Sequence, residues 1–275
     1  MKYGWIPDLP DARDRKFVAR ARNLKSLPPS IDWTPQLPPI YDQGKLGSCT
    51  AQALVAAFSF PALTVSRSTF QPPSRLFLYW NERLILGSTD QDSGAMIRDG
   101  VKSLVSDGCC PEALWPYDPA RVFVQPPEPC YDAADTCTLQ SYSRVDNTLL
   151  EDILEALTFG PVVGGFSVYE SFESDKVGRT GIVPMPGRDE SILGGHAIVV
   201  SGYDQVAKRF RVRNSWGPVW GHRGSCFFPF DYFTNPDLAA DFWLLSNVAE
   251  TPLPEIPGGN GSKGTNGTKG TEVSA

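Results

Sequence analysis

The sequence changes character at Gly160-Pro161, and no other feature constrains the fold as strongly. Before this point apolar residues recur at helical spacing; after it the apolar runs are short, rich in β-branched and aromatic residues, and separated by turn residues. The expected helices cover residues 49–60, 74–86, 94–105 and 148–160, the last opened by a capping box of Thr148 and Glu151. The expected strands cover residues 162–169, 196–202, 210–213, 224–230 and 241–246. Helices followed by antiparallel strands predict an α+β fold with two lobes and a substrate groove between them.

Length and composition narrow the possible partners. The chain has 275 residues, enough for one large domain or two halves that share a cleft. No stretch approaches the roughly 20 apolar residues of a membrane span, so no membrane partner is expected. The net charge of -6 disfavours nucleic acid, because phosphate binding needs a basic face. The N-terminus has no apolar signal region, so a cytoplasmic location is the default expectation.

Three segments are expected along the chain. Residues 1–27 form a polar leader with several prolines and interleaved charges, residues 28–250 form the folded domain, and residues 251–275 form a low-complexity tail that cannot build a core. The basic residues of the leader alternate with aspartates, which is typical of a solvated segment. Two hypotheses remain open for the leader: it crosses the groove and hinders substrate, or it packs as a strap on the back of one lobe.

The six cysteines are too few and too unevenly spaced for a disulfide scaffold, so most are expected to be free thiols. Cys130 and Cys137 lie in a Pro-rich loop and could pair. With two histidines in the chain and no Cys-x-x-Cys pair, a zinc site is not expected. The sequence therefore predicts neither a metal nor a cofactor.

Cys49 is the candidate nucleophile. It opens the Ala-rich run 49–60, which reads as a buried helix that begins after the capping-type Ser48 and ends at Pro61. A thiol with a pKa of about 8.5 needs help to ionise, and the amides and dipole of a helix N-terminus favour a thiolate. Cys226 lies among phenylalanines in a strand and is expected to be a structural thiol.

A base, an orienting amide and an oxyanion donor are available for Cys49. His196 begins an apolar strand after two glycines, whereas His222 lies in a turn and is expected to be incidental. Asn214, after another strand, could hold the imidazole ring in place. Gln43 precedes Cys49 by a short Gly-containing loop, so its amide and the Cys49 backbone N–H could converge on one oxygen.

Together these residues resemble the papain/cathepsin family of cysteine peptidases, in its short-leader form. The resemblance covers about residues 27–246 and rests on Trp33, Gln43-Gly44-Lys45-Leu46-Gly47-Ser48-Cys49, Gly195-His196-Ala197 and Asn214-Ser215-Trp216-Gly217. It implies a papain-like two-lobed fold, with a helical N-terminal lobe and an antiparallel, β-barrel-like C-terminal lobe. The chain departs from the family signature at Leu46, where a Cys is usual, and at Thr50, where an aromatic is usual.

The resemblance also implies an activity and a set of substrate contacts. It implies a cysteine peptidase that cleaves peptides or proteins through Cys49, His196, Asn214 and Gln43 by way of a thioester. We expect this peptidase to be a monomer. The implied substrate-binding residues are Ser93, Gly94, Gly165, Gly194, Gly195 and Trp216. Because two wall positions of the main specificity pocket are glycines, this pocket should be wide and should accept Leu, Phe or Tyr. No acidic residue is evident in it from the sequence.

Two alternatives compete with the peptidase hypothesis. A transglutaminase-like acyl transferase also pairs Cys with His, but it typically uses Asp where this chain has Asn214. A catalytically silent peptide-binding homologue would keep the fold without turnover, since function resides in the site and not in the fold.

Overall fold

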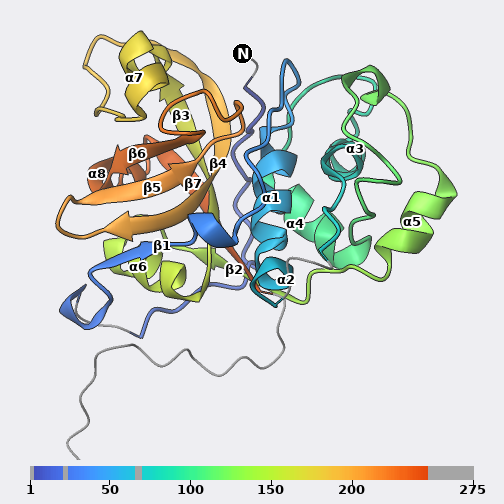
Figure 1. The fold of residues 1–275 in the computed structure, drawn as a ribbon, viewed down its shortest axis with the longest axis horizontal. Coiled ribbons are helices and arrows are strands. Elements are labelled where there is room, and N and C mark those ends of the chain that lie inside the picture. The colour runs from blue at the N-terminus through green and yellow to red at the C-terminus, as the bar shows by residue number, and fades with distance from the viewer. Residues whose placement is uncertain (1–2, 21–23, 66–69, 247–275) are drawn as a thin grey trace, which may run out of the picture.

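A computed structural model describes residues 3–20, 24–65 and 70–246. Two lobes lie side by side, one mainly helical and one built on a sheet, as expected for an α+β chain (Figure 1). The helical lobe contains α1 (Cys49–Phe58), α2 (Phe60–Val65), α3 (Arg75–Leu86), α4 (Ile97–Ser106) and α5 (Glu128–Ala134). Short 3-10 turns at Leu24–Ser26, Thr34–Gln36 and Pro119–Arg121 connect the segments.

Within the described residues, seven strands form one antiparallel sheet. They are β1 (Ser30–Asp32), β2 (Ser141–Val145), β3 (Val162–Tyr169), β4 (Ile192–Asp204), β5 (Arg209–Arg213), β6 (Ser225–Pro229) and β7 (Ala239–Ser246). Their order is β2-β7-β3-β4-β5-β6, with β1 paired to β4. The sheet of this lobe is not closed into a true barrel, because β2 and β6 are its two edges. Helices α6 (Leu150–Phe159), α7 (Asp175–Thr180) and α8 (Phe230–Thr234) and the 3-10 turn Glu170–Glu173 complete this lobe.

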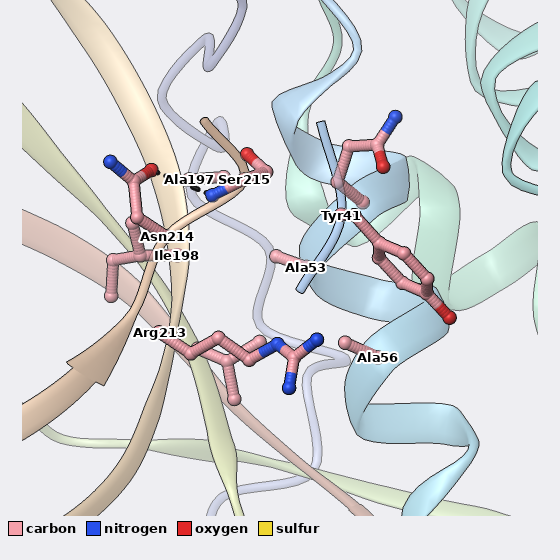
Figure 2. A pocket seen from close by; sticks show the side chains of 10 residues that line it. Tyr41, Ala53, Ala56, Ala197, Ile198, Arg213, Asn214 and Ser215 are labelled. Carbon is pink, nitrogen blue, oxygen red and sulfur yellow. Dashed lines mark hydrogen bonds between the residues drawn. The ribbon is translucent and has the colours of Figure 1, made fainter. Parts of the chain in front are cut away.

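Helix α1 is the central element of the molecule. All ten of its residues are buried, because it packs on α3 and α4 on one side and on β4 on the other. Its small side chains let the lobes approach closely, and Figure 2 shows Arg213 reaching from β5 towards Ala56 of α1. Burial lowers the pKa of Arg213 to about 10, and its guanidinium lies 5.7 Å from the ring of Tyr41. The position of α1 between the lobes fixes its N-terminus at the head of the groove.

Several helix ends differ from those expected. The run 49–60 divides at Ser59 into α1 and α2, since Pro61 is tolerated in the first turn of a new helix. Ser48 makes no capping bond; its hydroxyl lies 2.6 Å from the Tyr117 hydroxyl instead. The capping box is also wrong, because the Thr148 hydroxyl donates to Asp146 (2.6 Å) and α6 begins at Leu150. The expected tail, 251–275, lies outside the described residues.

The leader follows the groove between the lobes, between α1 and β4 (Figure 1). Near its start, Trp5 pairs in parallel with Ala95 of the helical lobe, and further on Lys16 pairs in parallel with Arg144 of β2. The Phe17 N–H donates to the Arg144 carbonyl (2.8 Å), and the Arg144 N–H donates to the Arg15 carbonyl (2.7 Å). The leader is therefore packed structure that touches both lobes.

Candidate active site

Cys49 is the first residue of α1 and is completely buried. Burial raises the pKa of its thiol to about 12, since a thiolate loses its hydration there. Backbone hydrogen bonds from Ala197 and from Gly4 of the leader lower this pKa only in part. The thiol is thus neutral while the leader covers it.

His196, in β4, contacts Asn214, just after β5, and the backbone of the next β4 residue, Ala197, reaches the Cys49 thiol. The His196 Nε2 lies 2.8 Å from the Asn214 Oδ1, and the ring of Trp216 lies 5.1 Å from the imidazole. The other ring nitrogen, Nδ1, has no hydrogen-bond partner among the residues that the structure describes. Burial lowers the pKa of His196 to about 4, so the imidazole is also neutral under the leader. Trp216 shields the His196–Asn214 contact from water.

Gln43 is fully buried against Ser215, the residue after Asn214. Its Oε1 accepts from the Ser215 hydroxyl (2.7 Å), and its Nε2 donates to the Leu46 carbonyl (2.9 Å). The Gln43 backbone N–H also donates to the Ser215 carbonyl (2.9 Å). Sequence reasoning missed the orienting role of Ser215, although its place next to Asn214 is a usable signal.

Thr50, where the family has an aromatic residue, contacts a side chain that the sequence did not single out. Its hydroxyl donates to Glu82 of α3 (2.7 Å), a fully buried carboxyl close to Cys49. Burial raises the pKa of Glu82 well above its usual range, which favours the neutral form of the carboxyl. His222 lies exposed in a turn away from this group.

Ser93 and Gly94, the expected backbone wall, lie beside the leader segment at Gly4. The Gly94 N–H donates to the Tyr79 hydroxyl (3.1 Å), and the Ser93 hydroxyl contacts Ser88 (2.8 Å). The next residue, Ala95, pairs with the leader: its N–H donates to the Gly4 carbonyl (2.8 Å), and its carbonyl accepts from Ile6 (3.0 Å).

The leader fills the positions expected to bind substrate. A Cβ on Gly165 would lie 2.1 Å from the Trp5 ring, and one on Gly194 would lie 2.8 Å from Tyr3. The Trp5 N–H donates to the Gly195 carbonyl (3.0 Å), next to His196. Five of the six expected substrate-contact residues, Gly94, Gly165, Gly194, Gly195 and Trp216, therefore lie against Tyr3 to Trp5 of the leader. Ser93 bonds to Ser88 and to the Gly94 carbonyl instead.

The described residues contain neither a membrane-spanning helix nor a cluster of metal ligands. No helix within them is long and apolar enough to cross a membrane. No three of their His, Cys, Asp or Glu side chains gather as metal ligands would. All six cysteines are free thiols, and the suggested bridge between Cys130 and Cys137 is not formed.

A buried cysteine at a helix N-terminus, with its thiol at the Ala197 backbone next to the His196–Asn214 pair, is the arrangement of a cysteine peptidase. More narrowly, the chain belongs to the papain family of cysteine proteases, whose sequence pattern matches residues 27–231. The family resemblance and the two-lobed α+β fold are thereby confirmed, and the protein is a papain-like hydrolase that acts on peptides or proteins.

Three relatives illustrate the similarity. An uncharacterised peptidase C1-like protein of Acanthamoeba polyphaga mimivirus is 39% identical, over 90% of this chain and 88% of its own length. The crystal structure of xylellain, a cysteine protease from Xylella fastidiosa, is 40% identical, with a TM-score of 0.82 over 90% of this chain and 96% of that one. Digestive procathepsin L 3 of Tenebrio molitor shares the fold, with a TM-score of 0.66 over 85% of this chain and 73% of that one. Its sequence identity is 19%.

Proposed function

We propose that the chain hydrolyses peptide bonds through a Cys49–His196 thiolate mechanism. The observation that carries this proposal is the 2.8 Å contact between His196 Nε2 and Asn214 Oδ1. It fixes the ring and leaves Nδ1 to take the proton of Cys49. The thiolate then attacks the peptide carbonyl carbon, and the former carbonyl oxygen becomes an oxyanion.

Later steps use the same residues. The Cys49 backbone N–H and the Gln43 amide, oriented by Ser215, stabilise the oxyanion. His196 returns its proton to the leaving amine, which leaves an acyl group on Cys49 as a thioester. A water activated by His196 then hydrolyses the thioester and restores the thiol.

We further propose that the leader, residues 1–27, inhibits this site in the groove. Gly4 hydrogen-bonds at the thiol, and the leader's backbone bonds to Ala95 on one lobe and Gly195 on the other. By excluding water, it also keeps Cys49 and His196 neutral, so no thiolate is present to cut the leader. The groove hypothesis is thus better supported than the strap hypothesis.

An ionic cluster supports the same proposal by anchoring the leader beyond the site. Asp14 of the leader accepts from Arg98 (2.6 Å) and Arg144 (3.0 Å), and the Asp8 carboxylate accepts from the Arg98 backbone N–H (3.1 Å). The Asp14 and Arg98 side chains are only 9% and 6% exposed, so water screens this pair weakly. The leader is held at the thiol and again at this cluster.

The test combines labelling and turnover. An epoxysuccinyl reagent should label Cys49 stoichiometrically and abolish cleavage of a fluorogenic dipeptide, whereas transfer of the acyl group to an added amine without hydrolysis would favour the acyl transferase. Labelling without turnover of any peptide would favour the silent homologue. Deletion of residues 1–27 should raise kcat/KM in a folded product; equal activity would favour the strap.

A further inference from the structure

The Trp5 side chain shows the shape of the pocket that it fills. Its ring lies flat on Gly165 and Gly195, where added Cβ atoms would lie 2.1 Å from Cε2 and 2.8 Å from Cε3. Trp5 is only 8% exposed, so nearly the whole indole is enclosed. The pocket is therefore open enough for a two-ring side chain because its walls carry no side chains at these two positions.

The indole N–H of Trp5 contacts a charged side chain at the bottom of the pocket. Trp5 Nε1 donates to Asp241 Oδ2 (3.2 Å), and the Asp8 backbone N–H donates to the same oxygen (2.7 Å). Asp241 is 2% exposed and has a φ of 61°, left-handed backbone inside strand β7. It lies beside a bulge, since β7 residue Ala240 pairs with Gly165 where the β3–β7 register shifts. This unusual backbone presents the carboxylate to the pocket.

The charges around Asp241 decide which substrates it would favour. Its Oδ1 accepts from Arg144 Nη2 (2.7 Å), and Arg98 is close enough to interact electrostatically. When the leader leaves, Asp8 and Asp14 leave with it, and Asp241 then faces two arginines alone. A cationic substrate side chain would meet those arginines and gain no advantage. When the leader leaves, the Asp241 Oδ2 loses both of its hydrogen-bond donors, the Trp5 indole N–H and the Asp8 backbone N–H.

We infer that Asp241 is a specificity-determining residue that selects, in the pocket of Gly165, a flat aromatic side chain ending in an N–H donor: tryptophan above phenylalanine. The inference rests on the proposed peptidase function and assigns its substrate class. A bound Trp restores the donor that Asp241 Oδ2 loses when the leader leaves. A bound Phe fills the pocket but leaves this buried oxygen without a replacement, which costs affinity.

The first experiment compares substrates that differ by the N–H alone. In a full-length Gly4→Ala chain, kcat/KM is measured for acyl-Xaa-Ala-aminomethylcoumarin with Xaa as Trp, 3-benzothienylalanine, Phe or Arg. Benzothienylalanine has the shape of Trp with sulfur in place of N–H. We expect Trp to exceed benzothienylalanine by about tenfold, as a hydrogen bond to a charged group would give.

Asp241→Asn should abolish this preference. Asn tolerates the left-handed backbone, but Arg144 will orient the amide oxygen towards itself and leave an NH2 group facing the indole N–H. The matched control Asp237→Asn, at an exposed position before β7, should keep the tenfold ratio. Equal rates for Trp and benzothienylalanine in the Gly4→Ala chain, or an undiminished ratio in Asp241→Asn, would overturn the inference.

The second experiment does not depend on turnover. Trp5→Phe and Asp241→Asn are combined in a double-mutant cycle in the otherwise native chain, and the rate of Cys49 alkylation by iodoacetamide reports leader release. Trp5→Phe should speed alkylation about tenfold in the native background and less than twofold in Asp241→Asn. Such coupling without hydrolysis of any peptide would refute the peptidase proposal and support the assignment of Asp241 to the pocket. Hydrolysis without coupling would support the peptidase proposal and refute the assignment of Asp241.

Discussion

Gly4 lies where the leader passes closest to the wall of the groove, and Gly4→Ala tests directly whether the leader is seated there. A Cβ at residue 4 would lie 1.7 Å from the Gly47 carbonyl oxygen, and real contacts of this kind need 3.0 to 3.4 Å. The two backbones must therefore separate by 1.3 to 1.7 Å, which breaks the Ala95 N–H to Gly4 carbonyl bond (2.8 Å) and the Trp5 N–H to Gly195 carbonyl bond (3.0 Å). At about 1 kcal/mol each, their loss favours the open groove by ~2 kcal/mol, or roughly 30-fold.

Two measurements on the full-length chain check this value. The rate of Cys49 alkylation and the initial rate on a fluorogenic dipeptide should both rise by about that factor, up to the point where the groove is mostly open. Gly178→Ala is the matched control, because its Cβ would lie 3.9 Å from the nearest atom, in ordinary contact. If Gly4→Ala left both rates at the native value, the leader would not be seated over the thiol in solution, and the reasoning would be refuted.

The remaining predictions concern the catalytic group and its pocket. Cys49→Ala and His196→Ala should abolish hydrolysis without unfolding, whereas His222→Ala should leave kcat/KM nearly intact; appreciable turnover by Cys49→Ala would remove the nucleophile assignment. Gln43→Ala should lower kcat by about 10²-fold with little change in KM, and an unchanged kcat would exclude it from the oxyanion hole. Under the leader, burial lowers the pKa of His196 from 6.5 to about 4. Between pH 4 and 6.5 the chain with the leader in the groove therefore binds fewer protons than the chain with the groove open. Acid therefore favours opening of the groove. From pH 7 to 5 the His196 contribution should raise the open fraction by about 20-fold, measured as the ratio between the native chain and His196→Gln in leader amide exchange corrected for intrinsic rates. Gly165→Val should displace the leader and shift preference to smaller residues, and an unchanged preference would remove it from the wall.

The sequence predicted the parts of the fold that depend on local pattern. Strand β3 matches the expected 162–169, and α3 begins after Ser74, whose side chain accepts from the Phe77 N–H (3.1 Å) as an N-cap. The capping box failed because Asp146, two residues earlier, competes for the Thr148 hydroxyl. Whether the barrel-like lobe closes could not be predicted, because closure depends on which edge strands meet, and that pairing is set by the whole chain. Strand β2 was missed because its residues are half-buried and mostly polar.

The candidate site divides in the same way. Cys49, His196, Asn214 and Gln43 could be proposed because each has a chemical role that its residue type and neighbours suggest. Asp241 could not be proposed from the sequence, because a single acidic residue at the start of an apolar strand is typical of an exposed strand end. Its place in the groove is set by a bulge and by contacts with Trp5 and Arg144, far away in sequence.

The covalent continuity of the leader with the rest of the chain makes the proposed inhibition independent of concentration. Because the leader is covalently joined to the strands that follow it, closing the groove is a unimolecular step with an effective concentration of the order of millimolar. Dilution would therefore leave the fraction of covered enzyme unchanged. A cut in the chain between Lys16, which pairs with β2, and Ser30, where β1 begins, would turn the same contacts into a bimolecular complex that dilution can empty. Such a cut would release the enzyme without altering a single residue of the groove.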